Sequence, residues 1–262
     1  MNIKMIAVDL DGTLLRNDKT VSDYTTRVLR ACKQHGAKVV FATARSECDC
    51  TQYTSLIQPD AIISNRGATI SVGGDIIHRA VIDAETTNKI LALSISHPSV
   101  RHIIVYGDMG YISNIPASEY NPDWGAYNPE KYTDFSQGLD CGVYKITLEM
   151  FDDVTAEMIA AIFPSVNVVR FSGEPWFSFA NKTANKWEGV KIAAAHFGVD
   201  TGSVAAFGDD YSDIGMLKNC GIGVAVGNAI SEVKAAANYI CDTNDNDGVA
   251  KWLEENYAST AV

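Results

Sequence analysis

Two aspartates, Asp9 and Asp11, end an apolar run near the start of the chain, in the segment MIAVDLDGTLL. In an extended strand alternate residues point to the same face, so the two carboxylates can converge at the carboxyl end of the strand. Carboxylates held this close repel each other, and burying them unpaired is costly. Gly12 permits a tight turn beside them, and Thr13 adds a hydroxyl donor. The pattern therefore indicates a bound cation or a catalytic function.

Polar residues also follow two other apolar runs. The segment VVFATAR places Thr43 at the end of its run and Arg45 two residues later. The segment FGDDYSDIGML ends another run with Asp209, Asp210 and Asp213. Taken alone, the first motif is equally typical of a solvated turn. Three strands that bring such residues to one sheet edge favour a site, because open α/β sheets bind ligands at the carboxyl ends of their strands.

The elements that must position these residues form an alternating pattern. Short apolar, β-branched runs separated by helix-like segments occur at residues 3–10, 38–42, 61–64, 204–207, 221–226 and 239–241. Near-continuous apolar strands that alternate with helices are typical of a parallel sheet buried on both faces. We therefore predict a doubly wound, Rossmann-like α/β core, whose first helix spans Ser22 to His35 and stops at Gly36.

The middle of the chain follows a different pattern. Gly73-Gly74 lies between two strand-like runs and predicts a hairpin, and Asp83 is placed to cap a helix that stops before Pro98. Strand-like runs then occur as neighbours more often than as partners of helices, which indicates an antiparallel α+β unit. We expect a catalytic core of residues 1–81 and 184–262, interrupted by an inserted α+β cap of residues 82–183. Its irregular stretch carries five aromatic residues, Tyr120, Trp124, Tyr127, Tyr132 and Phe135.

Composition restricts the class of protein. The chain has 262 residues, 47% of them hydrophobic, and a net charge of −11. This charge would repel a phosphate backbone at long range, so we expect no nucleic-acid partner. No apolar run approaches the roughly 18 residues of a membrane span, and the N-terminus does not resemble a signal peptide. We expect a cytoplasmic protein that binds no membrane, with a small phosphorylated molecule as a possible ligand if a metal or local donors supply positive charge.

The cysteines and histidines give little sign of a metal or redox site. The six cysteines are scattered, and the five histidines show no spacing typical of metal ligands. Cys48 and Cys50 form a weak candidate pair, but one intervening residue and no nearby histidine favour reduced thiols.

The motifs DLDGTLL, FATAR, FGDDYSD and GVAVGNA, followed by NDNDGVA, occur in the order seen in the haloacid dehalogenase superfamily. Within it, the chain resembles the Cof-type sugar-phosphatase-like hydrolases with a type II (IIB) cap, and the resemblance covers nearly the whole length. It implies a phosphatase that uses Mg²⁺ and an aspartyl-phosphate intermediate. All-oxygen aspartate sites suit magnesium, and phosphate ester hydrolysis depends largely on positioning and charge stabilisation.

The resemblance also implies roles for individual residues. Asp9 would be the nucleophile and Asp11 the general acid and base, while Thr43 would donate to the phosphoryl oxygens. Asp9, the backbone carbonyl of Asp11, and Asp209 would hold the metal, with support from Asp213. Since an unperturbed aspartate is ionised at neutral pH, we expect substrate binding to shift Asp11 toward its protonated form. A lysine completes the family pattern, and Lys186 fits best, with Lys182 as the fallback and Lys191 as a further candidate.

Further residues are expected to contact the substrate. Ala44 replaces the glycine that is common between the threonine and Arg45, and it retains the backbone N–H. Asn65 is expected to line the site, and Asn228 is expected near it or as a helix cap. Arg66 stands where the family more often runs Asn directly into Gly, and it is equally compatible with an anion contact and with simple exposure. In the irregular stretch, packing is the favoured role of the aromatic residues.

Two other functions stay open at this point. A phosphomutase would use the same aspartyl phosphate but return the phosphoryl group to its substrate. A non-catalytic protein that binds phosphometabolites could keep the fold, although Asp9 and Asp11 are both present. A true dehalogenase is disfavoured, because that reaction needs neither Asp11 nor the magnesium-binding acids.

Overall fold

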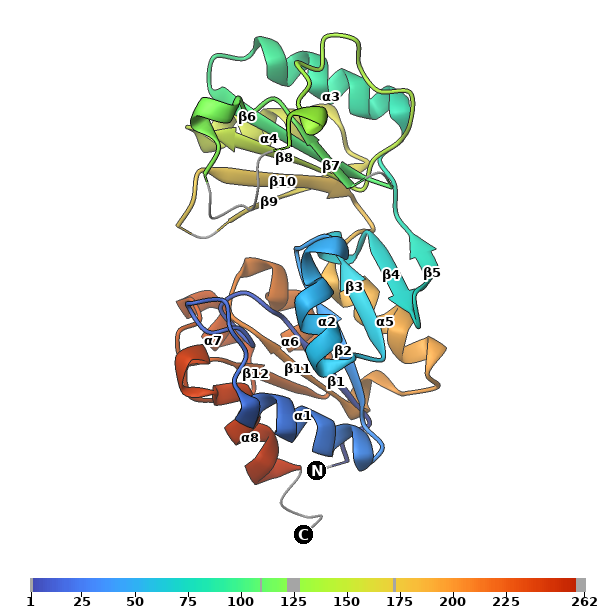
Figure 1. Ribbon diagram of the computed structural model, residues 1–262, viewed down its shortest axis with the longest axis vertical. Coiled ribbons are helices and arrows are strands. Elements are labelled where there is room, and N and C mark those ends of the chain that lie inside the picture. Colours follow the sequence, from blue (N-terminus) through green and yellow to red (C-terminus); the bar gives the residue numbers. More distant parts are fainter. Residues whose placement is uncertain (1, 109, 122–127, 172, 258–262) are drawn as a thin grey trace. The chain divides into compact units, whose positions relative to one another are not determined.

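A computed structural model describes residues 2–108, 110–121, 128–171 and 173–257 of the chain. The chain divides into two compact units (Figure 1). Unit 1 comprises Met1–Arg79 and Thr183–Val262, and unit 2 comprises Ala80–Lys182. The two ends of the sequence therefore form one unit, and the middle forms the other.

Unit 1 is built on a sheet of eight strands. In spatial order these are β13 (Tyr239–Ile240), β12 (Ile222–Ala225), β11 (Val204–Gly208), β1 (Met5–Val8), β2 (Lys38–Ala42), β3 (Ala61–Ser64), β4 (Thr69–Val72) and β5 (Asp75–Arg79). The strands from β13 to β3 pair in parallel. The hairpin of β4 and β5, which turns at Gly73-Gly74, adds an antiparallel edge to the otherwise parallel sheet.

Helices cover both faces of this sheet, which confirms the doubly wound core (Figure 1). One group consists of α1 (Asp23–Gln34), α2 (Thr51–Ile57) and α8 (Gly248–Asn256), where α1 contacts the other two. The other consists of α5 (Lys186–His196), α6 (Ile214–Asn219) and α7 (Ser231–Ala236), where α6 contacts the other two. Strands covered on both sides must be apolar throughout, and all four residues of β1 are buried.

Local signals explain where the helices begin. The Ser22 side chain accepts a hydrogen bond from the backbone N–H of Thr25 and caps α1, and Gly36 follows the helix with a φ of 92°. Asn185 caps α5 in the same way by accepting from the N–H of Glu188. The buried residues of α5, Lys186, Gly189, Val190, Ala193 and Ala194, recur at helical spacing. Helix α5 therefore carries its N-terminal lysine into the interior.

Within its described residues, unit 2 contains a five-stranded antiparallel sheet and two α-helices, in agreement with the α+β prediction. Its strands, in spatial order, are β7 (Gly110–Ser113), β6 (Val100–Gly107), β8 (Lys145–Met150), β10 (Trp176–Asn181) and β9 (Val166–Arg170). Helices α3 (Ala84–Ser96) and α4 (Asp153–Ile162) are capped by Asp83 and Asp152. They pack on one face through a core that includes Ile90, Ile159, Ile103, Leu148 and Phe179. The opposite face carries alternate residues of the same strands, among them Lys145, Thr147 and Glu149.

The aromatic residues of unit 2 take different positions. Phe135 is buried in the core of this unit, while Tyr132 is exposed and the Tyr120 hydroxyl lies 3.5 Å from that of Tyr111. Phe135 therefore has the packing role that was expected of the aromatic residues. Trp124 and Tyr127 lie outside the described residues.

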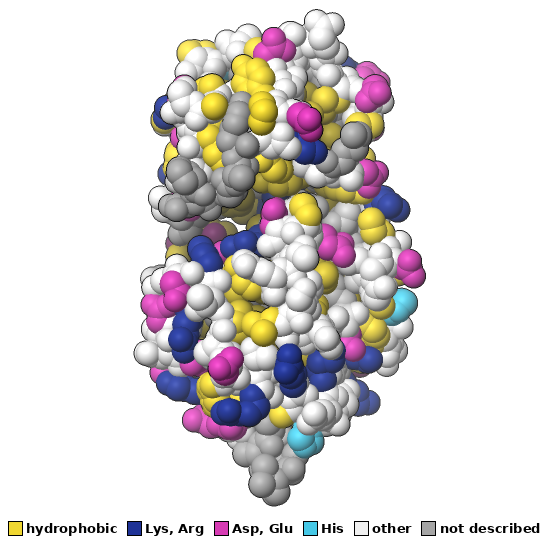
Figure 2. Space-filling view, in the orientation of Figure 1, with side chains coloured by type: hydrophobic (Ala, Val, Ile, Leu, Met, Phe, Trp, Pro, Cys, Tyr) yellow, Lys and Arg dark blue, Asp and Glu magenta, His cyan; other side chains and the backbone are white. Residues whose placement is uncertain are grey.

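The surface of the molecule mixes charges of both signs. On the face drawn in Figure 2, acidic and basic side chains are interspersed, with small groups of apolar side chains between them. Among the helices of the described residues, none has the length and apolar character needed to cross a bilayer.

The close approach of α5 to the sheet depends on Gly189. A Cβ on this residue would lie 2.4 Å from Cγ2 of Ile63 in β3. We predict that Gly189→Ala lowers the free energy of unfolding by about 1–3 kcal/mol through overpacking, although alanine is intrinsically the better helix former by about 1 kcal/mol. Urea unfolding measures this change.

The matched control removes the opposing methyl group. Ile63→Ala alone should cost about 2–5 kcal/mol, but the double variant should cost less than the two single changes together, because the clash is gone. Additive costs, or a more stable Gly189→Ala protein, would show that this contact does not set the position of the helix.

Candidate active site

The carboxyl ends of four neighbouring strands bring the predicted residues to one edge of the unit 1 sheet. Asp9 follows β1, Thr43 follows β2, Asn65 follows β3 and Asp209 follows β11. The backbone N–H of Asp9 donates to the carbonyl of Phe207 at 3.1 Å, which ties the end of β1 to the end of β11. The order of the strands therefore assembles residues that lie about 200 positions apart in the sequence.

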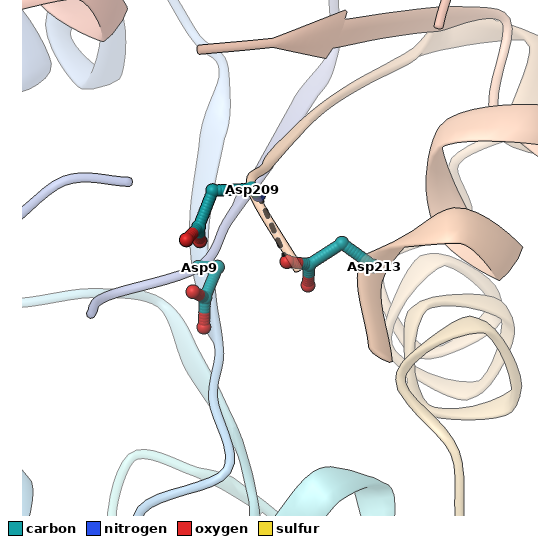
Figure 3. A group of neighbouring side chains, drawn as sticks. All are labelled: Asp9, Asp209 and Asp213. Carbon is teal, nitrogen blue, oxygen red and sulfur yellow. Dashed lines mark hydrogen bonds between the residues drawn. The ribbon is translucent and has the colours of Figure 1, made fainter. Parts of the chain in front are cut away.

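Three carboxylates form the centre of this edge (Figure 3). One oxygen from each of Asp9, Asp209 and Asp213 lies within 4.8 Å of the others. Gly12 makes room for this group, because a Cβ there would lie 2.3 Å from Oδ2 of Asp209, and its φ of 74° suits glycine. The Thr13 hydroxyl donates to Asp209 at 2.7 Å. Gly12 and Thr13 thus hold the Asp209 carboxylate against the first loop.

Lys186 is buried within the same group. Its Nζ lies 2.7 Å from Oδ1 of Asp9 and 2.6 Å from Oδ1 of Asp213. The other oxygen of Asp213 accepts the backbone N–H groups of Asp209 and Asp210 at 3.0 and 3.1 Å. Helix α5 begins at Lys186 itself, so the lysine lies in the first turn rather than in a segment before the helix. Lys182 lies in unit 2, and the Lys191 side chain is 43% exposed, so Lys186 is the lysine that the structure brings to the carboxylates.

The charges of this group are unbalanced. Burial raises the pKa of Asp9 well above its usual range; Lys186 opposes this effect, and Asp213 and Asp209 reinforce it. Burial and the Asp213 carboxylate raise the pKa of Asp209 to about 6, against the hydrogen bond from Thr13. Burial would lower the pKa of Lys186, but Asp213 and Asp9 outweigh it and raise that pKa, so the amine stays protonated. Three carboxylates around one ammonium group leave an excess of negative charge.

This excess fits a divalent cation. Hard cations such as Mg²⁺ bind carboxylate oxygens, and all three side chains supply them within a buried or half-buried setting. A cation would also offset the repulsion between carboxylates, which adds to burial in raising the pKa values of Asp9 and Asp209. The side chains of Asp9, Asp209 and Asp213 therefore suit the metal expected from the sequence.

The Asp11 carboxylate is held away from this group by two cations. Arg45 donates to both of its oxygens, from Nε at 2.6 Å and from Nη2 at 2.7 Å, and Lys19 Nζ donates at 2.9 Å. Burial opposes ionisation of Asp11, but Arg45 and Lys19 outweigh it and lower its pKa to about 2. In this arrangement Asp11 is an ionised carboxylate, and its side chain is not part of the group of three.

The residues after β2 and β3 form two turns that are linked through their backbones. The N–H of Asn65 donates to the carbonyl of Arg45 at 2.8 Å, and the N–H of Arg66 donates to the carbonyl of Thr43 at 3.0 Å. The Thr43 hydroxyl accepts from the N–H of Arg45 at 3.1 Å, and Ala44 lies between them. Arg66 is 2% exposed, so the interpretation of simple exposure was wrong.

Asn228 joins the first loop to the C-terminal segment. Its amide donates to the carbonyl of Gly12 at 2.6 Å and accepts from the N–H of Asn244 at 2.9 Å. It does not cap a helix, because α7 begins after Ile230, and the cap interpretation was therefore wrong. Asp210 instead caps the short turn Tyr211–Asp213, and it lies outside the group of three carboxylates.

Two contacts were not foreseen from the sequence. Thr13 was recognised as a donor, but its partner Asp209 is 196 positions away. Lys19 was not singled out, although the segment Asn17-Asp18-Lys19 has the composition of a turn and Lys19 has a φ of 64°. Nothing in the local sequence indicates that its ammonium group reaches Asp11.

The sequence matches a family model over residues 6–253, and that family is described as haloacid dehalogenase-like hydrolase. The match spans both units. It confirms the resemblance given by the motifs.

Curated relatives are similar over almost their whole length. A putative phosphatase of Haemophilus influenzae is 28% identical, and the alignment covers 98% of this chain and 99% of the relative. A 5-amino-6-(5-phospho-D-ribitylamino)uracil phosphatase of Bacillus subtilis is 30% identical, with 96% and 94% covered.

Solved structures share the fold. A sugar phosphatase of haloacid dehalogenase subclass IIB superposes with a TM-score of 0.87 at 24% identity, covering 97% of this chain and 99% of the other. A phosphatase of the same superfamily from Bacteroides thetaiotaomicron gives a TM-score of 0.83 at 26% identity, with 97% and 94% covered.

The buried lysine makes a testable contribution to stability. We predict that Lys186→Met lowers the free energy of unfolding by about 3–5 kcal/mol at pH 7.5, because it leaves buried carboxylates without their cation. Loss of the ammonium raises the pKa of these carboxylates further in the folded state. Protons then bind the folded state more readily than the unfolded one, so the penalty should shrink as pH falls toward 5.5. Urea unfolding in metal-free buffer at both pH values measures it.

The control is Lys191→Met on the same helix, where the exposed amine pairs with Glu188. This change should cost less than about 0.5 kcal/mol at either pH. Similar costs for both lysines, or a penalty for Lys186→Met that does not vary with pH, would contradict the assigned electrostatics.

Proposed function

The chain belongs to the haloacid dehalogenase-like hydrolases and is a phosphatase, and we propose that it hydrolyses a small phosphorylated metabolite in a Mg²⁺-dependent reaction through an aspartyl phosphate. The observation that carries the proposal is the buried Asp9 carboxylate. It lies 2.7 Å from the Lys186 ammonium group and within 4.8 Å of the Asp209 and Asp213 carboxylates. A carboxylate in this setting is fixed in place and stays beside positive charge when an anionic phosphoryl group approaches.

In the proposed site, Asp9, Asp209 and the backbone carbonyl of Asp11 would hold the metal, with support from Asp213. When bound, Mg²⁺ would neutralise part of the charge on the phosphoryl oxygens. Lys186 supplies a second positive charge, which is fixed by Asp9 and Asp213 at 2.7 and 2.6 Å. Together they account for how a chain with a net charge of −11 binds a phosphate ester.

The first half of the reaction transfers the phosphoryl group to Asp9. A carboxylate oxygen of Asp9 attacks phosphorus, and the bond between phosphorus and the leaving oxygen breaks. Asp11 gives its proton to that oxygen. In the second half Asp11 takes a proton from water, the water oxygen attacks phosphorus, and Asp9 is released together with inorganic phosphate.

Asp11 requires a change of environment for this role. The Arg45 and Lys19 side chains lower its pKa to about 2 despite its burial, which favours the form that cannot donate a proton. We propose that substrate binding draws these cations toward the phosphoryl group and shifts Asp11 toward its protonated form. Arg45 is suited to such an exchange, because a guanidinium group binds carboxylate and phosphate with the same fork of donors.

Other residues at this edge are proposed to bind the phosphoryl group or line its pocket. Thr43 would donate its hydroxyl, and the backbone N–H of Ala44 lies in the same turn. Asn65, Arg66 and Asn228 follow the neighbouring loops. Residues 1–81 and 184–262 would form the catalytic core, and residues 82–183 a cap that selects the leaving group.

The proposed substrate class is a sugar phosphate or a similar phosphorylated metabolite. The name of the Bacillus subtilis relative adds 5-amino-6-(5-phospho-D-ribitylamino)uracil to the compounds that should be assayed. We also propose that the protein acts in the cytoplasm without a nucleic-acid or membrane partner. Its six cysteines are free thiols, as expected in a reducing compartment.

Phosphate release tests the proposal directly. We expect the protein to release phosphate from at least one of a panel of sugar phosphates, nucleotides, pyridoxal phosphate and the ribitylamino-uracil phosphate. EDTA should abolish the activity and added Mg²⁺ should restore it. Asp9→Asn should lower kcat by at least about 10³-fold, because the amide cannot replace the nucleophile.

Asp245→Asn is the matched control. Asp245 is an exposed aspartate in the same unit that contacts Asn17 and lies outside the group of three carboxylates. Its activity should stay within about twofold of the parent protein. Isomerisation of a sugar phosphate without release would instead indicate a phosphomutase, and binding without turnover would indicate a non-catalytic protein.

A further inference from the structure

Arg66 is a buried cation at the edge of the sheet that binds the proposed substrate. It is 2% exposed and lies in the turn Asn65–Gly67, directly after β3. Its backbone has a φ of 62°, and that of Asn65 has a φ of 48°. Residues other than glycine rarely adopt this left-handed backbone conformation, because it is strained. Backbone strain of this kind is concentrated at functional sites.

The surrounding structure fixes this turn. The N–H groups of Asn65 and Arg66 donate to the carbonyls of Arg45 and Thr43, as described above. On the other side, a Cβ on Gly67 would lie 2.3 Å from the backbone oxygen of Asn185, the residue that caps α5 ahead of Lys186. The turn that carries Arg66 is therefore held between the Thr43 loop and the start of α5, and both of these segments carry residues of the site.

The guanidinium group also interacts with the opposite side of the site. Burial lowers the pKa of Arg66 to about 10, and the Asp210 carboxylate acts in the opposite direction. Asp210 follows β11, and β1 and β2 separate β11 from β3 in the sheet. Arg66 and Asp210 therefore follow strands that flank the two strands leading to Asp9 and Thr43, and their charges act on each other across this edge of the sheet.

A buried arginine in this position is suited to bind an anion. Its charge is costly to desolvate, and its planar fork of donors matches a carboxylate or a phosphate. The reacting phosphoryl group already has a partner in Lys186, which contacts Asp9 directly. Arg66 follows β3, and β2 lies between β3 and β1, the strand that leads to Asp9, so the backbone of Arg66 lies beside the point of attack.

We propose that Arg66 binds a second anionic group, a carboxylate or a second phosphate, on the leaving group of the substrate. The substrate of this phosphatase would then be a phosphorylated metabolite that carries a further negative charge. This inference rests on the proposed phosphatase function and adds the class of substrate to it. Arg66 is accordingly a specificity-determining residue, and Lys186 serves the reaction common to all substrates.

Matched substrate pairs test the inference in the full-length protein with Mg²⁺. One pair is 3-phosphoglycerate and glycerol 3-phosphate, which differ by a carboxylate. The other is fructose 1,6-bisphosphate and fructose 6-phosphate, which differ by a phosphate. In at least one pair, the member with the additional anion should have a kcat/KM at least tenfold higher, and the two pairs distinguish the carboxylate from the phosphate.

Two variants assign that preference to Arg66. Arg66→Gln should lower the preference about 10- to 100-fold, the range expected for a hydrogen-bonded charge pair, because kcat/KM falls more for the member with the additional anion than for its partner. Arg66→Lys keeps the charge and should retain part of the preference. Thermal unfolding of both variants identifies any loss of folding, and a folded Arg66→Lys protein is sufficient for the comparison.

Binding gives a readout that does not need turnover. In the Asp9→Asn background, isothermal titration with the same four compounds should show the same preference, and the additional change Arg66→Gln should remove it. Equal losses for both members of each pair, or no preference in the parent protein, would overturn the inference. Phosphate release without a preference would reject the inference alone, while the absence of release from these four compounds and from the whole panel above would reject the proposed function.

Discussion

The buried ion pairs of Lys186 are the interaction on which the rest of the site depends. One ammonium group contacts both Asp9 and Asp213, and the carboxylates around it carry more negative charge than it neutralises. Burial strengthens the repulsion between these carboxylates, because the low dielectric of the protein interior screens charges far less than water does. The site thus favours an additional cation and fixes Asp9 in one position at the same time.

The fold can be understood as the means of holding this group together. Parallel strands β1 and β11 place Asp9 beside Asp209, and a helix packed closely against β3 carries Lys186 to them. Each part needs an unusual local fit, such as Gly12 against Asp209 and Gly189 against Ile63. The second cationic arrangement, Arg45 and Lys19 on Asp11, is largely separate from the first. One edge of the sheet therefore holds two aspartates of the same motif in opposite electrostatic states.

The residue pattern was sufficient to predict the alternating core, the α+β insertion and the arrival of Asp9 and Asp209 at one edge of the sheet, whereas Lys186 was identified only through the family resemblance. Strand patterns and short motifs are local, and parallel order brings their ends together. The sequence was not sufficient to predict contacts between side chains that lie far apart along the chain. The reach of Lys19 to Asp11, the burial of Arg66 and the contacts of Asn228 depend on loop conformations that local composition does not determine. The antiparallel edge strands were visible as a hairpin, but their place in the sheet was not.

The most direct test of the account is to trap the phosphorylated enzyme. Protein in excess over ³²P-labelled acetyl phosphate, with Mg²⁺ present, would be quenched in acid within the first turnover and digested with trypsin. The account predicts label on the peptide Met5–Arg16, located at Asp9 by mass spectrometry, and loss of the label when quenching is delayed. Phosphate release at the full rate with no labelled peptide would contradict it, because water would then attack the substrate directly.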